Sequence, residues 1–376
     1  MQEPITYVGM DDHKDTIQAA IRSPGGGDMS LHTVANEPRA LRRFAGDLVK
    51  GAPGPVMSCY EAGPNGYALQ RCLERAGIGC QVVAPSLTPV RPGERVKTDR
   101  RDARKLAELL AAGLLIEVAP PTEAEEAVRD LCRCREAAQK DLTRCRHRLD
   151  KFLLRRGQIY RDGRAWTQKH RQWLWSLRLE PAADQLILED CLLAVEQLET
   201  RLKELDRQLE AVAAEAPYRQ PVGWLRCFRG IDTLSAMTLV TELHGVERFH
   251  SARQLMAYTG LTAREASTGK RQWRGRITKA GNAHLRRILV EAAQHYRHRP
   301  AVGRTLAKRR QGQPAWAISL ADRAQKRLYH RYTHLLLSRS KSKGKVVVAM
   351  ARELSGFVWA TLVLGPRYGH TDDATH

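Results

Sequence analysis

Four carboxylates in the first third of the chain stand where predicted strands end or a helix begins. Asp11 and Glu61 each follow a short apolar run with strand character, and Asp99 and Asp102 are three residues apart at the start of a helical pattern. Residues i and i+3 share a helix face, so the last two side chains can point to one place. Carboxylates that converge from two strand ends and one helix make a hard oxygen site for Mg²⁺, which can polarise a phosphate and activate a water or hydroxyl. Acids are also common as helix caps, and spacing alone leaves both interpretations open.

A second group of candidate residues lies in the segment Gly260–Arg271, where hydroxyl side chains stand among cations. Ser267 is available there to attack a phosphodiester, and the neighbouring cations can neutralise charge on the transition state. Without other information, the residues favour simple phosphate binding over catalysis. The candidate nucleic-acid-binding side chains, all Lys or Arg, are Arg264, Lys270, Arg271, Arg274, Arg276, Lys279, Arg286 and Arg287.

Strand and helix patterns alternate over the first 115 residues. The predicted strands are residues 5–10, 16–21, 56–60 and 80–83. The predicted helices are residues 37–50, 64–76 and 99–115. This α/β layer, with acids at the ends of its strands, is typical of the RNase H-like nuclease fold, and we expect it to form a domain of residues 1–118.

The strand signals vanish from residue 123 to residue 216, and two apolar seams replace them. Apolar residues recur at alternating spacings of three and four over residues 188–212 and again over 128–152, where Arg135 is the one polar member. Such heptad seams predict an antiparallel coiled coil with arms about 35 Å long at 1.5 Å per residue. We assign residues 119–216 to this region and expect its arms to pack on each other or on a second protomer, as in a homo-oligomer.

From residue 217 to residue 364 the chain is predicted to be mainly helical with short basic loops, and residues 365–376 form a polar tail. The whole chain has a net charge of +21, and residues 264–345 contain 22 Lys or Arg against 3 acids. One region therefore carries nearly the whole excess, which indicates a polyanionic partner, either nucleic acid or a membrane surface.

A membrane is the weaker of these two partners. The best candidate for a span, residues 346–364, contains Arg352 and Glu353 near its middle, and a central charge costs roughly 2.5 to 3.5 kcal/mol to insert. The N-terminus lacks the basic and apolar regions of a signal peptide, and the eight scattered cysteines do not suggest a disulfide framework. We therefore expect a cytoplasmic protein with reduced thiols, a nucleic-acid partner and no membrane partner.

Four motifs along nearly the whole chain carry a resemblance to a known family. They are Val-Gly-Met-Asp-Asp-His-Lys-Asp at residues 8–15, Tyr-Glu-Ala-Gly at 60–63, Lys-Thr-Asp-Arg-Arg-Asp-Ala at 97–103, and the block from Ser251 to the Gly-Arg-Ile-Thr-Lys-Ala-Gly-Asn sequence ending at Asn282. In this order they resemble the DEDD transposases of bacterial insertion sequences, also called bridge-RNA-guided serine recombinases.

The resemblance implies a RuvC-like N-terminal domain joined by a coiled coil to a C-terminal transposase domain that holds a nucleophilic serine. Carried over, the Mg²⁺-binding catalytic carboxylates are Asp11, Glu61, Asp99 and Asp102, and the nucleophile is Ser267. The serine would form a covalent phosphoserine with DNA in a composite site shared by different protomers of a tetramer. A structured non-coding RNA would pair with target and donor DNA in the bacterial cytoplasm, at the nucleoid.

Three sites depart from the family pattern, and one of them is Gly230-Ile231-Asp232, where the family has Gly-Ile-Gly. The family commonly has Ser-Ser-Gly-Gly where this chain has Ser267 and Thr268 followed by Gly-Lys, and we prefer Ser267 as nucleophile because a secondary hydroxyl is more hindered. Asp12 replaces an aliphatic residue after Asp11. Successive strand residues point to opposite faces, so only one of these acids can face the other carboxylates, and the motif alignment favours Asp11.

Two other functions fit the residues. A metal-only RuvC-like nuclease, such as a junction resolvase, would need the four carboxylates but not Ser267. A noncatalytic DNA- or RNA-binding protein would use the basic region and keep the acids as caps.

Overall fold

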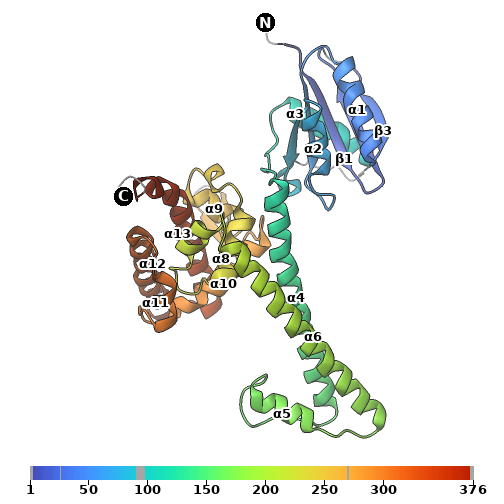
Figure 1. Ribbon diagram of the computed structural model, residues 1–376. Helices are drawn as coiled ribbons and strands as arrows, with labels where there is room; N and C mark the ends of the chain where they lie inside the picture. The colour runs from blue at the N-terminus through green and yellow to red at the C-terminus, as the bar shows by residue number, and fades with distance from the viewer. Residues whose placement is uncertain (1–2, 26, 90–97, 269–270, 373–376) are drawn as a thin grey trace. The chain divides into compact units, whose positions relative to one another are not determined.

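The computed structural model describes residues 3–25, 27–89, 98–268 and 271–372 (Figure 1). The chain divides into two compact units, Met1–Pro121 and Thr122–His376. The first unit is an α/β layer, and the second contains two long helices and the basic C-terminal region.

The first unit is built on a five-stranded sheet in the order β3-β2-β1-β4-β5. β1 pairs with β2, and β2 with β3, in antiparallel fashion, whereas β1–β4 and β4–β5 are parallel pairs. The strands are β1 (Thr6–Asp12), β2 (Thr16–Arg22), β3 (Ser30–Ala35), β4 (Val56–Glu61) and β5 (Gly79–Val83). The carboxyl ends of the three parallel strands therefore meet at one edge of the sheet.

Helices cover both faces of this sheet. α1 (Pro38–Gly51) and α2 (Ala68–Arg75) pack on one face around Val8, Met10 and Tyr60, while α3 (Asp99–Ala111) packs on the other. A short 3₁₀ helix, η1 (Pro85–Leu87), follows β5. Gly9 of β1 lets α3 approach closely, because a Cβ at this position would overlap the backbone of Ala103 and Ala107.

The second unit begins with two long helices, α4 (Glu123–Arg155) and α6 (Ala182–Ala213), with α5 (Gln168–Ser176) between them in sequence. They run antiparallel, as shown by the ion pairs Arg135–Asp206 and Arg146–Glu199. Buried residues of both expected seams pack together in two apolar clusters, and Arg135, the polar seam member, makes its ion pair at 2.7 Å. That these helices supercoil as a coiled coil stays a prediction.

The rest of the second unit is helical around one large apolar core, with a single hairpin among the described residues. Its helices are α7 (Arg219–Leu225), α8 (Thr233–Leu243), η2 (Val246–Arg248), α9 (Ala252–Tyr258), α10 (Ala283–Ala293), η3 (Gln294–Arg297), α11 (Arg304–Arg310), α12 (Ala315–Thr333), the π-helix η4 (His334–Ser338) and α13 (Lys343–Asp372). Its strands are β6 (Ala263–Thr268) and β7 (Arg271–Ile277).

The apolar helix α13 belongs to this core. Its segment Lys343–Gly365 has a window of mean hydropathy 1.5 and could cross a membrane by length and composition, as no other helix in the described part of the chain could. Val346, Met350 and Leu354 in this segment are fully buried in the apolar core of the second unit. The helix therefore packs as the core helix of a globular unit does.

Two elements differ from the sequence expectations. Strand β3 is not predicted, because it is largely exposed at the sheet edge and its apolar residues do not alternate with polar ones. The segment Gly260–Arg271, for which no strand is predicted, contributes β6 and the first residue of β7. These two strands pair only with each other, so they lack the apolar alternation that marks a strand packed on a core.

Candidate functional site

Asp11 and Glu61 lie at the carboxyl-end edge of the parallel strands. Asp11 is the penultimate residue of β1, Glu61 ends β4, and the register pairs the residues directly before them, Met10 and Tyr60. Side chains alternate along a strand, so Asp11 shares the face of Gly9, which α3 covers. By the same rule Glu61 shares the face of the residue two before it, which packs against α3. Both carboxylates therefore belong to the α3 side of the sheet.

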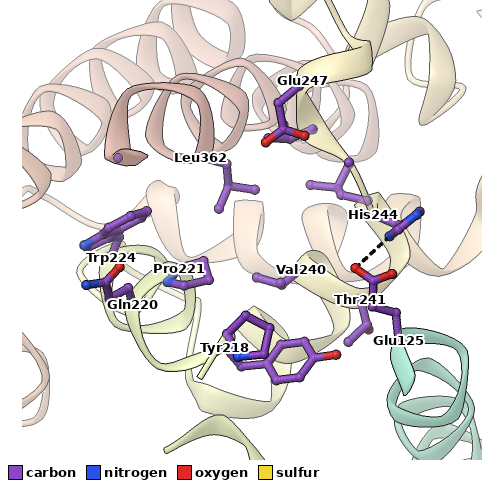
Figure 2. Close-up of a pocket in the computed structure, with 15 residues that line it drawn as sticks. Glu125, Tyr218, Gln220, Pro221, Trp224, Val240, Thr241, His244, Glu247 and Leu362 are labelled. Carbon is purple, nitrogen blue, oxygen red and sulfur yellow. Dashed lines mark ion pairs between the residues drawn. The ribbon is translucent and has the colours of Figure 1, made fainter. Parts of the chain in front are cut away.

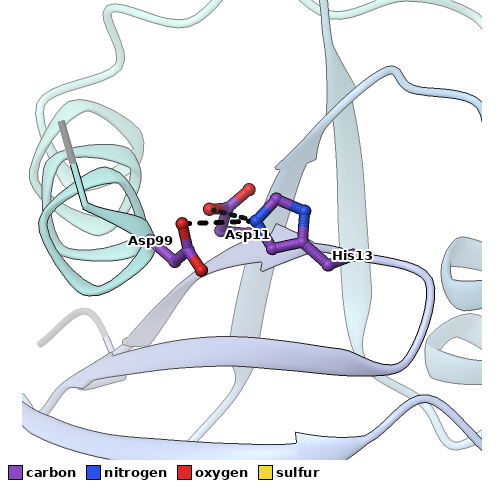
Figure 3. A group of neighbouring side chains, drawn as sticks. All are labelled: Asp11, His13 and Asp99. Carbon is purple, nitrogen blue, oxygen red and sulfur yellow. Dashed lines mark ion pairs between the residues drawn. The ribbon is translucent and has the colours of Figure 1, made fainter.

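The structure brings Asp11 and Asp99 together, and His13 with them (Figure 3). Asp99 is the first residue of α3, and the Nε2 atom of His13 lies 3.4 Å from Oδ2 of Asp11 and 3.3 Å from Oδ1 of Asp99. The hydrogen bond to Asp99 and the charge of Asp11 raise the pKa of His13. Glu61 and Asp102, although both are described, stand outside this group of ligand atoms.

Asp12 lies on the other face of the sheet. One of its carboxylate oxygens, Oδ1, accepts hydrogen bonds from Nδ2 of Asn36 at 2.9 Å and from Nδ2 of Asn65 at 3.0 Å. Burial raises the pKa of Asp12, although the two amides act in the opposite direction. Of the two adjacent acids, Asp11 is thus the one that lies beside Asp99.

The donor set of Asp11, His13 and Asp99 suits a small divalent cation. One ligand atom from each residue lies within 4.8 Å of the other two. Neighbouring ligands of a six-coordinate ion with bonds of about 2.1 Å are about 3 Å apart, close to the observed separations. The side chains of Asp99 and His13 are 57% and 51% exposed, so ions and phosphates can reach them from solvent.

The hairpin β6–β7 contains the predicted nucleophile. In its backbone register Ser267 pairs with Gln272 and Thr268 with Arg271, and the pairing is irregular between Ala263 and Glu265. The predicted contact Lys270 lies outside the described residues, as do the side chains of Ser267, Thr268, Arg271 and Arg274. Three further predicted nucleic-acid contacts are exposed to solvent: Arg264, Arg276 and Lys279.

The base of this hairpin is a close crossing of two chain segments. Gly260 and Gly281 both have φ in the left-handed region, at 66° and 70°, and a Cβ on either would overlap the backbone of the opposite segment. Arg286, another predicted nucleic-acid contact, donates from Nη1 to the carbonyl oxygens of Thr259 at 3.0 Å and Ala280 at 3.3 Å. Its guanidinium thus holds the crossing together from within the protein.

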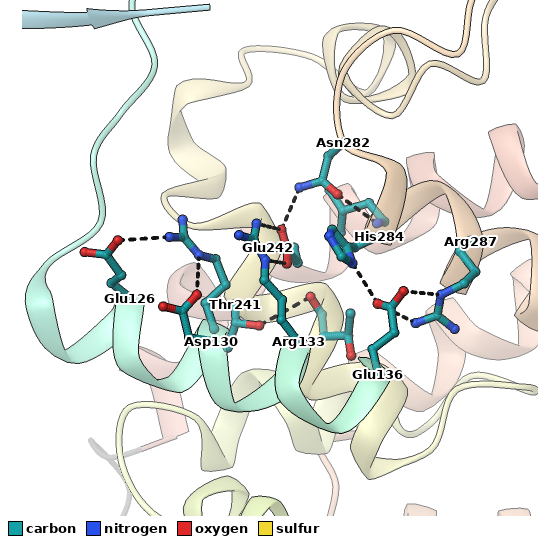
Figure 4. A network of polar contacts seen from close by, with 12 residues as sticks. Glu126, Asp130, Arg133, Glu136, Thr241, Glu242, Asn282, His284 and Arg287 are labelled. Carbon is teal, nitrogen blue, oxygen red and sulfur yellow. Dashed lines mark hydrogen bonds and ion pairs between the residues drawn. The ribbon is translucent and has the colours of Figure 1, made fainter. Parts of the chain in front are cut away.

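A buried acid connects the hairpin base to the long helix α4 (Figure 4). Glu242, whose side chain is 1% exposed, accepts from Arg133 of α4 at 2.7 and 3.0 Å and from Nδ2 of Asn282 at 2.7 Å. Asn282 also caps α10 by accepting from the backbone N–H of Leu285. Burial acts to raise the pKa of Glu242, but these bonds outweigh it and the pKa is lowered.

A second acid on α4, Glu136, binds three cationic or hydrogen-bonding side chains. It lies 2.7 Å from Nδ1 of His284, 2.9 Å from Nη2 of Arg287 and 2.6 Å from Nζ of Lys140. Burial alone would raise the pKa of Glu136, but these contacts hold it at about 2. Arg287 also pairs with Glu291 at 3.0 Å, so this predicted nucleic-acid contact is engaged inside the second unit.

A cavity of about 510 Å³ also lies in the second unit, between the aromatic side chains of Tyr218 and Trp224 and the Glu125–His244 ion pair of 3.2 Å (Figure 2). None of the predicted site residues lines it.

Three residues described above were absent from the predicted site: His13 and the two acids Glu136 and Glu242. For His13 a signal existed, because it directly follows the strand that ends in Asp11 and Asp12.

An α/β unit with carboxylates at the ends of parallel strands, together with a strongly basic helical unit, fits the class of DNA-processing enzymes. Comparisons with known proteins give the family. Residues 8–156 match the profile of a family described as "Transposase", of the DEDD type, and residues 224–308 match the family described as "Transposase IS116/IS110/IS902 family". The chain belongs to this family of insertion-sequence DEDD transposases.

Individual relatives agree with this assignment. The protein y4qE of Sinorhizobium fredii is 42% identical over 305 residues, which cover 81% of this chain and 75% of y4qE. The transposase for insertion sequence element IS1533 of Leptospira borgpetersenii is 34% identical over 339 residues, covering 89% of this chain and 98% of the relative. As a transposase of the DEDD type, the protein binds DNA and uses a divalent metal.

Proposed function

We propose that this transposase cuts and rejoins DNA through a covalent phosphoserine at Ser267, assisted by a metal-binding carboxylate site and guided by a structured RNA. The observation that carries the proposal is the convergence of Asp11 and Asp99 at the edge of the parallel strands. The sheet order β3-β2-β1-β4-β5, with three antiparallel strands followed by two parallel ones, supports an RNase H-like, RuvC-like fold for the first unit.

Asp11 and Asp99 hold the metal in this proposal, and Glu61 and Asp102 complete its ligand set from the same side of the sheet. A bound Mg²⁺ supplies Lewis-acid polarisation of the phosphate and charge neutralisation. The protein's part is to fix the carboxylates, which it does by packing α3 directly on β1 at Gly9. Asp99 and Asp102 lie in the first turn of α3.

The serine step exchanges one phosphoester bond for another. The Ser267 hydroxyl oxygen forms a bond to the phosphorus and loses its proton, while the bond from phosphorus to a deoxyribose oxygen breaks and that oxygen takes up a proton. The exposed cations Arg264, Arg276 and Lys279 neutralise charge on the phosphorus centre. Attack by the hydroxyl of a second DNA strand reverses the step and rejoins DNA without an external energy source.

Guidance by RNA agrees with the charge distribution. A net charge of +19 over residues 264–345 favours contacts to phosphate backbones, which carry no sequence information. If RNA pairing reads the target and donor DNA, the protein needs shape and backbone contacts, as in other guided systems. The proposed assembly is a tetramer whose active sites each combine the first unit of one protomer with the second unit of another, working at the nucleoid.

The test uses the full chain with Mg²⁺, RNA transcribed from the flanking element and its cognate DNA. Wild-type protein is expected to form a protein–DNA adduct that survives denaturant, and Ser267→Ala is expected to form none. Thr268→Val serves as the matched control and should keep the adduct. Metal-dependent cleavage without an adduct in any variant would place the chemistry in the carboxylates alone and favour the metal-only nuclease.

A further inference from the structure

The imidazole of His13 contacts both of the converging carboxylates through a single atom. Its Nε2 lies 3.4 Å from Asp11 and 3.3 Å from Asp99, so one nitrogen and two oxygens face a common point (Figure 3). The four-acid pattern that names the DEDD type does not include this residue. The structure nevertheless places it in one group with Asp11 and Asp99, a group to which Glu61 and Asp102 do not belong.

The backbone of His13 is fixed, which keeps its side chain at the strand end. Its N–H donates to the carbonyl oxygen of Thr16 at 3.1 Å, across the connection from β1 to β2. Its carbonyl oxygen accepts from Nδ2 of Asn36 at 2.7 Å. Asn36 also donates to Asp12, so one amide anchors both residues that follow Asp11. Both the backbone N–H and the backbone carbonyl of His13 therefore make hydrogen bonds, and these bonds hold the residue that carries the imidazole in place.

The separations suit direct ligation. Neighbouring ligand atoms on a six-coordinate divalent ion are about 3 Å apart and opposite ones about 4.2 Å, from bond lengths of about 2.1 Å. The distances of 3.3 and 3.4 Å from Nε2 to the two carboxylates fall between these values. An ion held by Asp11 and Asp99 is thus within reach of His13 without movement of the backbone.

We infer that His13 is a further protein ligand, beside Asp11 and Asp99, of the metal that the proposed function requires, and that the site binds Mn²⁺ more tightly than Mg²⁺. The inference rests on the proposed carboxylate site. Oxygen ligands alone suit Mg²⁺, whereas an imidazole nitrogen favours first-row transition ions. Mixed oxygen and nitrogen ligation accommodates Mn²⁺, which shares the octahedral preference of Mg²⁺ but accepts nitrogen more readily.

The test detects the nitrogen itself, using the full chain labelled with ¹⁵N-histidine and loaded with Mn²⁺. Pulsed electron paramagnetic resonance is expected to show hyperfine coupling from one histidine nitrogen in wild type and none in His13→Gln. His32→Gln is the matched control, because His32 is an exposed histidine on β3 of the same unit, and it should keep the coupling. A Mn²⁺ titration should show binding at least about tenfold weaker in His13→Gln, and an excess of Mg²⁺ should displace Mn²⁺ more easily from that variant.

The outcomes separate this inference from the proposed function. Mn²⁺ bound in an Asp99-dependent manner without histidine coupling in wild type would overturn the role of His13 and leave the carboxylate site standing. Coupling that persists in His13→Gln would also overturn it. Failure of wild type to bind Mn²⁺ or Mg²⁺ at millimolar concentration would overturn both the inference and the metal site. The wild-type coupling is read without any substitution, so the test does not depend on the variant's folding.

Discussion

The group Asp11, His13 and Asp99 in the first unit and the hairpin base in the second unit differ in how far their charged side chains are exposed to solvent. Asp99 and His13 are more than half exposed, whereas Glu242 is buried and accepts bonds from both Arg133 and Asn282. A site that binds ions and phosphate must leave its ligand atoms accessible, and a support must have its polar groups satisfied. In the proposed function, this difference separates the residues that bind metal and phosphate from the residues that hold the surrounding elements in place.

The largest expected effect comes from the exposed group. Asp99→Asn should lower metal-dependent DNA cleavage by at least about 100-fold, because a metal contributes several kcal/mol to transition-state stabilisation. The melting temperature should stay close to that of wild type, since the Asp99 side chain is 57% exposed. Asp12→Asn is the matched control and should retain activity within about tenfold of wild type. A larger loss in Asp12→Asn than in Asp99→Asn would reverse the assignment of the two faces.

The next effect concerns the contact that positions α3. Gly9→Ala should destabilise the first unit by about 3 kcal/mol or more, because the added Cβ overlaps the backbone of Ala103 and Ala107. Gly46→Ala in α1 is the control, with no atom within 4 Å of its added Cβ. It should be neutral or stabilising by up to about 1 kcal/mol. Chemical denaturation of both variants measures the difference, and equal stability would show that α3 does not rest on Gly9.

The buried support is tested by Glu242→Gln, which leaves Arg133 without its countercharge. The second unit should lose about 1–2 kcal/mol of stability, because Glu242 is buried but Arg133 is 40% exposed and can be solvated when its partner is removed. Glu204→Gln offers a comparison, because Glu204 pairs with Arg207 on an exposed helix face, and its thermal unfolding should match wild type. Thermal unfolding of Glu242→Gln that also matched wild type would refute the supporting role of Glu242.

The last effect is a pH dependence from Glu136. Its pKa is about 2 in the folded protein, against an ordinary value of 4.5, so its contribution is present above pH 4.5 and lost as the pH falls toward 2. At neutral pH this contribution is about 1–2 kcal/mol, because its partners stay in contact with solvent. Urea denaturation of wild type and Glu136→Gln should therefore converge at low pH. A stability difference independent of pH would contradict this.

Local pattern was enough to predict the α/β layer and the meeting of Asp11 with Asp99. Strand alternation and helix spacing act over a few residues, and the carboxyl ends of parallel strands share one edge. The same reasoning missed the supporting network, because Glu242 and Arg133 are 109 residues apart in sequence, and His284 and Glu136 are 148 apart. No local pattern marks such pairs. The hairpin that holds Ser267 is not predicted, because its strands pair with each other in the described part of the chain and show no apolar alternation.

The most direct test of the proposal that two protomers share each active site is a mixture of two inactive variants. Asp99→Asn keeps the serine and Ser267→Ala keeps the carboxylates, and the two are co-expressed so that mixed oligomers form. If each active site combines units from two protomers, some sites in the mixture are intact, and a DNA adduct should reappear on the Asp99→Asn chain. No adduct in verified mixed oligomers would contradict the shared site.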